Sequence, residues 1–163
     1  MIDGLSKLMN VGKGVQFHLP SSLSDFGKPL GFNSKLPTGS EIISVSHAVH
    51  LLKEVCNYFK AINHPNGYFA AIYYLVTRMV EKGIEEEKFN DIETLEKVDI
   101  AFVSRYFEAL NHYFNEEEPT TPWKKSFEAC EDDGLFIDQY IFIAINAHMN
   151  YDLAYVVSDV CGD

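Results

Sequence analysis

The residues best suited to chemistry lie on one apolar segment near the C-terminus. Most positions between 141 and 160 are apolar, but His148 and Asp152 interrupt them at a spacing of four, and so do Asn146 and Asn150. In a helix, this spacing brings two side chains to within about 40° of each other. The His and the Asp can therefore hydrogen-bond each other or chelate one cation, and the two amides share another side.

Buried polar groups without partners cost a few kcal/mol each, so something must satisfy these four side chains. Three interpretations are open. In a structural network, Asp152 holds the His148 ring and the two Asn side chains bridge to neighbouring helices. In a metal or acid–base site, Asp152 is a ligand or the group that orients His148. The third interpretation is a coincidence on an exposed face.

Two histidines on another predicted helix can complete a metal site. His47 and His50 are one helical turn apart in the first predicted helix. His148 and Asp152 would be ligands of a divalent metal such as zinc, with His47 or His50 completing the set. The metal would activate water for hydrolysis of an ester or phosphoester. The alternative is that both are ordinary surface or half-buried histidines.

Hydrolysis without a metal is a variant of the same hypothesis. His148 would be the general base, Asp152 would orient it, and Asn146 or Asn150 would donate a hydrogen bond to a developing anion.

One more charged residue lies on an apolar stripe. Asp99 falls among the apolar positions of the third predicted helix, where an ion pair with Arg105 or Arg78 is the simplest expectation. Other chemistries lack their motifs, since the sequence has no Glu-x-x-His pair, no Gly-x-Ser-x-Gly and no Cys-x-x-Cys.

Hydrophobic periodicity predicts the helices that position these residues. Apolar residues recur at spacings of three and four over about 42–62, 66–83, 91–115 and 137–160, with a shorter helix at 121–130. Asn66 is placed to cap the second helix and Gly83 to end it. The centre of the last helix, 141–145, is apolar on every side, which is typical of a helix surrounded by others. Short loops favour antiparallel neighbours.

We therefore predict an all-α, single-domain bundle of four long helices and one short helix, preceded by an arm. Residues 1–40 hold six of the ten Gly and three of the six Pro and carry a net charge of +2. They are expected to form an extended N-terminal arm that packs on the body. Residues 41–163 form the helical bundle domain and carry −13.

Composition and charge limit the classes of partner that the chain can bind. The chain has 163 residues and a formal net charge of −11, which argues against binding to nucleic-acid phosphates or to an anionic membrane surface. Its apolar stretches are too short to insert into a membrane. The three widely spaced cysteines, Cys56, Cys130 and Cys161, do not form a disulfide framework, so we expect a cytoplasmic protein.

A non-catalytic role is the alternative to an enzyme. Aromatic residues make up 13% of the chain, so tyrosines can line a pocket between helices for a small-molecule ligand, although they can equally fill the core. The acidic runs 85–87 and 116–118 can meet a basic partner. The oligomeric state is left open.

Four segments resemble the family called domain of unknown function 5995. In chain order they read NGYFAAIYYLVTRMVEKG, EKVDIAFVSRYFEALNHYF, PWKKSFEA and INAHMNYDLAYVV, within residues 54–157. The family motif is His-Ile-Asn followed by Asp-Leu, and here it reads His148-Met149-Asn150 with Asp152-Leu153 after it. The resemblance implies that functional residues lie at His148, Asn150 and Asp152, with Asn146 nearby. It does not imply a particular reaction.

A more distant similarity concerns one ligand pair. His-x-x-x-Asp-Leu on a helix is similar to a pair of ligands in zinc-dependent phospholipases C. Those enzymes use further His and Asp ligands and an N-terminal Trp, whereas Trp123 is internal. This similarity implies one divalent metal at most.

Overall fold

The computed structural model describes residues 36–132 and 134–162, and within these residues it contains helices and no β-strand, which confirms the all-α prediction. A 3₁₀ turn, η2 (Gly39–Glu41), comes first. The helices are α2 (Val45–Ala61), α3 (Asn66–Glu85), α4 (Ile92–Phe114), α5 (Thr121–Ala129), α6 (Ile137–Asn146), the π-helical segment η3 (Ala147–Asp152) and α7 (Leu153–Cys161). The last three are continuous, so the predicted last long helix is present but is interrupted by a π turn.

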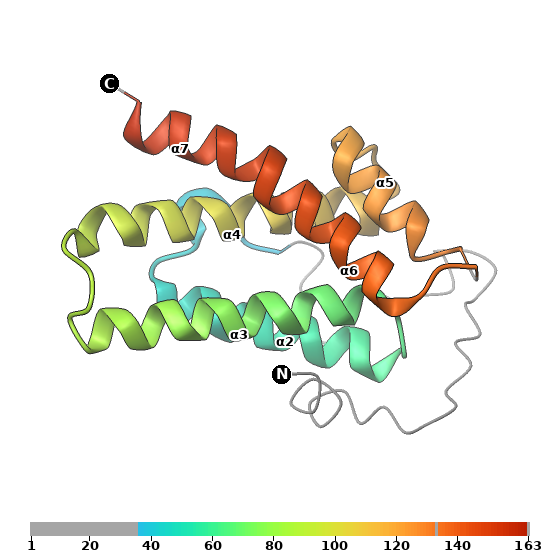
Figure 1. Cartoon of the computed structure of the whole chain (residues 1–163), viewed down its shortest axis with the longest axis horizontal. Coiled ribbons are helices and arrows are strands. Elements are labelled where there is room, and N and C mark those ends of the chain that lie inside the picture. Colours follow the sequence, from blue (N-terminus) through green and yellow to red (C-terminus); the bar gives the residue numbers. More distant parts are fainter. Residues whose placement is uncertain (1–35, 133, 163) are drawn as a thin grey trace.

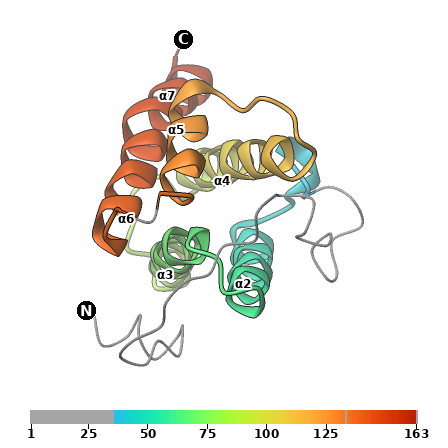
Figure 2. The same cartoon turned by 90° about the vertical axis from the view of Figure 1, so that its right-hand side faces the viewer.

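The helices enclose an aromatic core. α2 and α3 form an antiparallel pair, α4 lies over this pair, and α6–α7 cross one side of the bundle beside α5 (Figures 1 and 2). Large rings fill the interior between α3 and α4. The ring centroids of Phe69 and Tyr106 lie 5.2 Å apart, and those of Tyr106 and Trp123 also lie 5.2 Å apart. These edge and tilted contacts are the arrangements that aromatic pairs favour.

Side-chain caps explain where two helices begin. The Ser44 side chain accepts a hydrogen bond from the His47 backbone N–H at the start of α2, and Asp91 accepts one from the Thr94 N–H at the start of α4. Each cap satisfies a backbone donor that has no partner within the helix.

The bounds of α3 differ from the expectation at both ends. Pro65 occupies the N-cap position and Asn66 is already helical, so Asn66 does not cap the helix. Gly83 does not end α3, which continues to Glu85. A Cβ at position 83 would lie 2.5 Å from the Phe89 ring. Gly83 therefore lets the following loop fold back closely against the helix.

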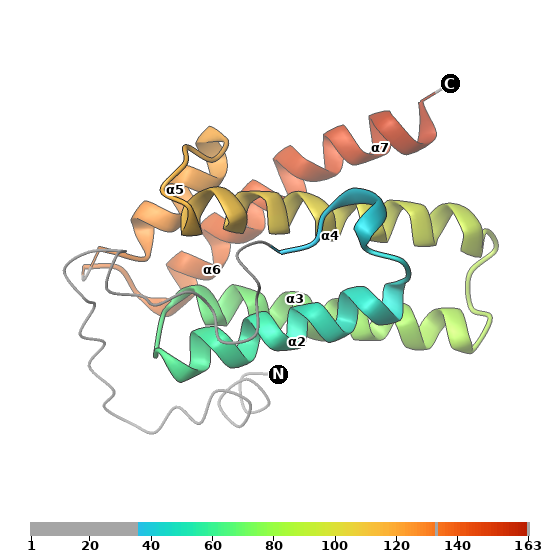
Figure 3. The same ribbon diagram turned by 180° about the vertical axis from the view of Figure 1, so that it is seen from behind.

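The residues that lead into α2 are held on α4. Leu36 is buried, its backbone N–H donates to Asn111 Oδ1 over 2.7 Å, and the Asn111 amide donates to the Leu36 carbonyl over 3.0 Å. The Gly39 N–H donates to Ser104 Oγ. Figure 3 shows this segment passing over α4. The rest of the predicted arm, residues 1–35, lies outside the described residues.

The expectation that other helices surround the last helix is wrong. Ala144 is the buried residue of α6, whereas Phe142 is 67% exposed, and Met149 and Val157 are exposed as well. The helix covers one side of the bundle, so one of its apolar faces meets no other element of the described chain (Figure 2). None of the described helices combines the length and the apolar character required of a membrane span.

Candidate functional site

His148 and Asp152 lie together in the core, within the π-helical segment η3. His148 Nδ1 lies 3.2 Å from Asp152 Oδ2, and the two residues are 3% and 1% exposed. The hydrogen bond expected from their spacing is confirmed. Single π turns inside α-helices are frequent at functional sites, because the wider turn redirects side chains.

Asp152 is the acceptor of three side-chain donors from three elements. Its Oδ2 accepts from His148 and from Trp123 Nε1, the latter over 2.8 Å, and its Oδ1 accepts from Arg105 Nε over 3.0 Å. The Arg105 guanidinium lies 4.8 Å from the centroid of the Tyr155 ring. Because α4, α5 and η3 all reach this carboxylate, its position is fixed by the packing of the bundle.

The surroundings of His148 define its protonation. The ring stacks on Phe102 with centroids 3.5 Å apart and planes 6° apart, and the centroid of Tyr73 is 4.4 Å away. Burial lowers the pKa of His148, and this outweighs the raising effect of the Asp152 hydrogen bond. The imidazole is therefore neutral at pH 7. Since a carboxylate only accepts, the ring proton sits on Nδ1, and the lone pair is on Nε2. This buried atom has no partner within residues 36–132 and 134–162.

Asp99 is buried near Tyr73, whose pKa it helps to raise, and its Oδ2 has no partner among the described residues. Burial raises its pKa to about 7. The ion pair expected for Asp99 is wrong: Arg105 binds Asp152, and Arg78 donates to the Tyr74 hydroxyl. Six positions separate Asp99 from Arg105, which places them on sides of α4 about 120° apart.

Asn146 and Asn150 lie outside this group. Both are exposed, and the Asn150 amide donates to Asn146 Oδ1 over 2.7 Å, so they bind each other instead of bridging to a neighbouring helix.

The two histidines of α2 also lie apart from His148 and Asp152. His47 is half-buried and its Nδ1 accepts from the Ile43 N–H over 3.4 Å, while His50 is exposed. In the described part of the chain, no three His, Cys, Asp or Glu side chains are placed to hold one metal ion. His47 and His50 are thus not gathered with His148 and Asp152. Both Asp152 oxygens are taken by N–H donors, so the donor set does not fit a metal centre.

The sequence did not reveal the roles of three residues that surround His148 and Asp152. These residues are Trp123, Arg105 and Tyr73. One signal was available for Trp123, because a buried indole N–H needs an acceptor. Arg105 was considered only for Asp99. Nothing in the spacing of Tyr73 distinguishes it from the tyrosines that fill the core.

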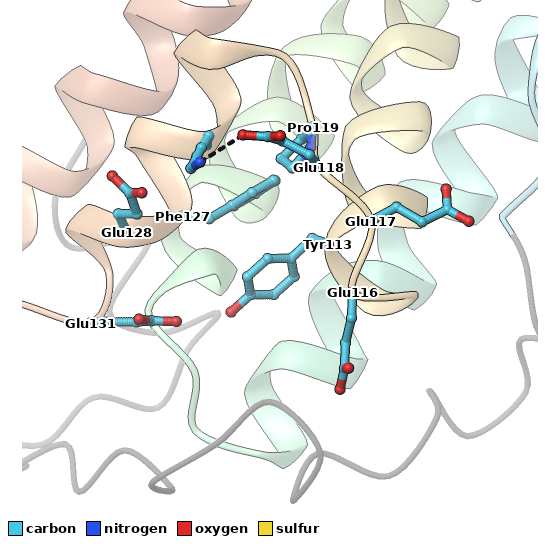
Figure 4. A pocket seen from close by; sticks show the side chains of 9 residues that line it. Tyr113, Glu116, Glu117, Glu118, Pro119, Phe127, Glu128 and Glu131 are labelled. Carbon is cyan, nitrogen blue, oxygen red and sulfur yellow. Dashed lines mark hydrogen bonds and ion pairs between the residues drawn. The ribbon is translucent and has the colours of Figure 1, made fainter.

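A separate pocket of about 410 Å³ lies where α4 ends and α5 follows. Tyr113 and Phe127 contribute its rings, and Glu116, Glu128 and Glu131 are among its acidic residues (Figure 4). Glu118 is paired with Lys124 over 2.6 Å.

Comparison with known proteins places the chain in a family. No curated protein sequence and no solved structure matches it. The model of DUF5995, described as a family of unknown function, matches residues 45–163, which include α2 to α7 and the His148–Asp152 pair. This chain therefore belongs to the DUF5995 family.

Proposed function

We propose that this protein is a small hydrolase in which His148 is the general base and Asp152 holds it in place. The observation that carries the proposal is the hydrogen bond from His148 Nδ1 to Asp152, which leaves the buried Nε2 with a lone pair and no partner. A carboxylate that fixes a neutral imidazole in this tautomer is the arrangement general bases use in acyl-transfer enzymes.

The proposed reaction is the attack of water on an ester. His148 Nε2 removes a proton from water, and the water oxygen attacks the carbonyl carbon or the phosphorus. The leaving oxygen departs with its bonding electron pair and takes the proton back from His148, so ester and water give an acid and an alcohol. Arg105 and Trp123 would keep Asp152 still during both proton transfers.

Water and substrate must reach a buried ring, so the proposal includes a local opening. Because Met149 and Asn150 of η3 are exposed, this segment has little packing to lose there, and we expect it to be the part that moves.

The test is turnover of p-nitrophenyl acetate and p-nitrophenyl phosphate by the purified full chain. We expect release of nitrophenol above the buffer rate, and a loss of about a hundredfold or more in His148→Ala. His50→Ala is the matched control, because this exposed histidine lies on another helix, and it should keep the full rate. Equal rates in His148→Ala and the unaltered chain would refute the proposal.

Metal-assisted hydrolysis, the other form of the hypothesis, is tested in the same assay. The residues around Asp152 do not supply a ligand set, so we expect a chelator to leave the rate unchanged. A chelator-sensitive rate restored by zinc would favour the metal form instead.

A non-catalytic binding role has its own supporting observation, the acidic pocket beside Tyr113 and Phe127. Aromatic faces next to carboxylates suit an organic cation. Calorimetric titration with spermidine tests this second candidate: saturable binding that Glu128→Gln and Glu131→Gln weaken supports it, and no heat of binding contradicts it.

A further inference from the structure

Four buried polar atoms that have no partner among the described residues come from α3, α4 and η3. They are Tyr73 Oη, Thr77 Oγ1, Asp99 Oδ2 and His148 Nε2, and all four residues are less than a tenth exposed. An unsatisfied buried polar atom destabilises the fold, because it has lost its hydrogen bonds to water. Four such atoms in one part of the core indicate a place that something else occupies, either water or a small ligand.

Contacts link these atoms into one neighbourhood. Tyr73 and His148 are neighbours through their rings, at 4.4 Å between centroids. Asp99 lies one helical turn before Phe102, the ring that stacks on His148. The carboxylates of Asp99 and Asp152 both help to raise the pKa of Tyr73, after burial, which raises it most. Thr77 follows Tyr73 by one turn on the same side of α3.

We infer that Tyr73 and Asp99 form the hydrogen-bond-donating side of this site, and that it accepts an uncharged carbonyl ester and not a phosphoester. The inference rests on the proposed function and specifies its substrate class. The Tyr73 hydroxyl and a protonated Asp99 carboxyl would each donate to the carbonyl oxygen, opposite His148. These donors would stabilise the negative charge that this oxygen gains when water attacks.

The charges near the site decide against a phosphoester. Arg105 is the cation that contacts Asp152, and this ion pair already occupies its guanidinium. Within residues 36–132 and 134–162, no other Lys or Arg side chain forms an ion pair or hydrogen bond with Tyr73, Asp99, His148 or Asp152. A phosphoester anion would lie near Asp152 without a cation of its own, which is unfavourable in a buried site.

Protonation of Asp99 gives the site a pH signature. Its pKa of about 7 means that the donor is present below pH 7 and lost above it. Tyr73 on α3 is the titratable group whose pKa the Asp99 carboxylate helps to raise, whereas Arg105 of α4 and His148 of η3 both bind Asp152 instead. Asp99→Asn replaces the acid by an amide that donates at every pH, whereas Asp99→Leu removes the donor.

The first experiment measures binding, so that it does not depend on turnover. Trp123 is the single Trp of the chain and is bonded to Asp152, which makes its fluorescence a reporter of the site. The probes are ethyl acetate and inorganic phosphate. We expect a saturable fluorescence change with ethyl acetate alone, weakened about tenfold in Tyr73→Phe and Asp99→Leu. Tyr74→Phe, on the neighbouring residue of α3, is the matched control and should bind normally.

The second experiment compares turnover of p-nitrophenyl acetate with that of p-nitrophenyl phosphate. We expect the acetate to be the better substrate, with a rate that falls above pH 7 in the unaltered chain but not in Asp99→Asn. A merely structural role for Asp99 would not produce this change of pH profile.

The outcomes separate the inference from the proposed function. Binding of ethyl acetate without any His148-dependent turnover would contradict the proposed hydrolase function but would support the inferred ligand class. Faster, His148-dependent turnover of the phosphate would keep the hydrolase and overturn the inference. Binding of neither probe, as expected if only water occupies the site, would also overturn it.

Discussion

At the scale of single residues, Asp152 connects three elements of the described chain. Its two carboxylate oxygens receive N–H donors from His148, Trp123 and Arg105, and its side chain is almost fully buried. A buried carboxylate is stable only when its charge is matched in this way. The same residue thus ties α4, α5 and η3 together and orients the proposed base.

Removing this carboxylate should destabilise the fold. Asp152→Ala leaves the Arg105 charge and the buried Trp123 N–H without their acceptor, so we expect a loss of about 3 kcal/mol in the free energy of unfolding. Urea denaturation measures it. Glu128→Ala removes an exposed carboxylate paired with Lys125 and should change the free energy of unfolding far less, because solvent screens an exposed pair. Equal effects of the two substitutions would contradict the central role of Asp152.

The raised pKa of Asp99 predicts how the free energy of unfolding changes with pH. Its folded pKa, about 7, lies above the ordinary value of 3.8, so the folded chain holds this proton more tightly than the unfolded chain. Its contribution is fully present below about pH 4 and is lost as the pH rises to about 7, by roughly 4 kcal/mol at most. In Asp99→Asn this loss is absent.

The measurement is the difference in unfolding free energy between Asp99→Asn and the unaltered chain at pH 5 and pH 8. The difference should shift in favour of Asp99→Asn at the higher pH, and other titrating groups cancel because both proteins carry them. Asp138→Asn, at an exposed position of α6, is the control. A difference that does not vary with pH would contradict the raised pKa.

Sequence reasoning identified the central pair but not its surroundings. A spacing of four correctly predicted the bond between His148 and Asp152, because it depends on local helix geometry alone. The same spacing applied to Asn146 and Asn150, which instead lie on the surface. Spacing indicates which side chains share a side of a helix, but packing against α4 and α5 decides which side is buried.

At the scale of elements, local rules located the helices better than their ends and faces. Periodicity and capping residues found all the described α-helices to within a few residues. The π turn of η3 gave no signal, since its residues continue an ordinary helical pattern. The exposed face of α6 was missed for a related reason: a helix that is apolar all round does not reveal that neighbours cover only one side.

The segment before α2 should depend on one side chain of α4. Asn111→Ala removes both hydrogen bonds to Leu36 and leaves a buried backbone N–H and carbonyl unpaired, so we expect a loss of about 2 kcal/mol in unfolding free energy. Hydrogen exchange at the Leu36 amide should accelerate more than exchange in α3. Asn146→Ala, an exposed amide, is the control and should change neither. Unchanged protection at Leu36 would contradict this anchoring.

At the scale of the whole molecule, most acidic side chains of residues 36–132 and 134–162 lie at helix ends and in loops, away from the buried site. Glu116, Glu117 and Glu118 follow α4 directly, and Glu128 and Glu131 face the same pocket from the far side. Two lysine pairings, Glu118 with Lys124 and Glu128 with Lys125, offset part of this charge. The carboxylates around this pocket therefore repel each other across its mouth, and folding holds them closer than the unfolded chain does.

This repulsion makes the stability sensitive to salt. Raising NaCl from about 0.01 M to about 1 M shortens the screening length from about 30 Å to about 3 Å, so the unfolding free energy should rise. Urea, being uncharged, is the suitable denaturant. The double substitution Glu116→Gln with Glu131→Gln should stabilise the chain at low salt and reduce its response to salt, while Asp159→Asn on α7 should leave that response nearly unchanged. Equal salt responses in all three proteins would show that the pocket carboxylates do not act together.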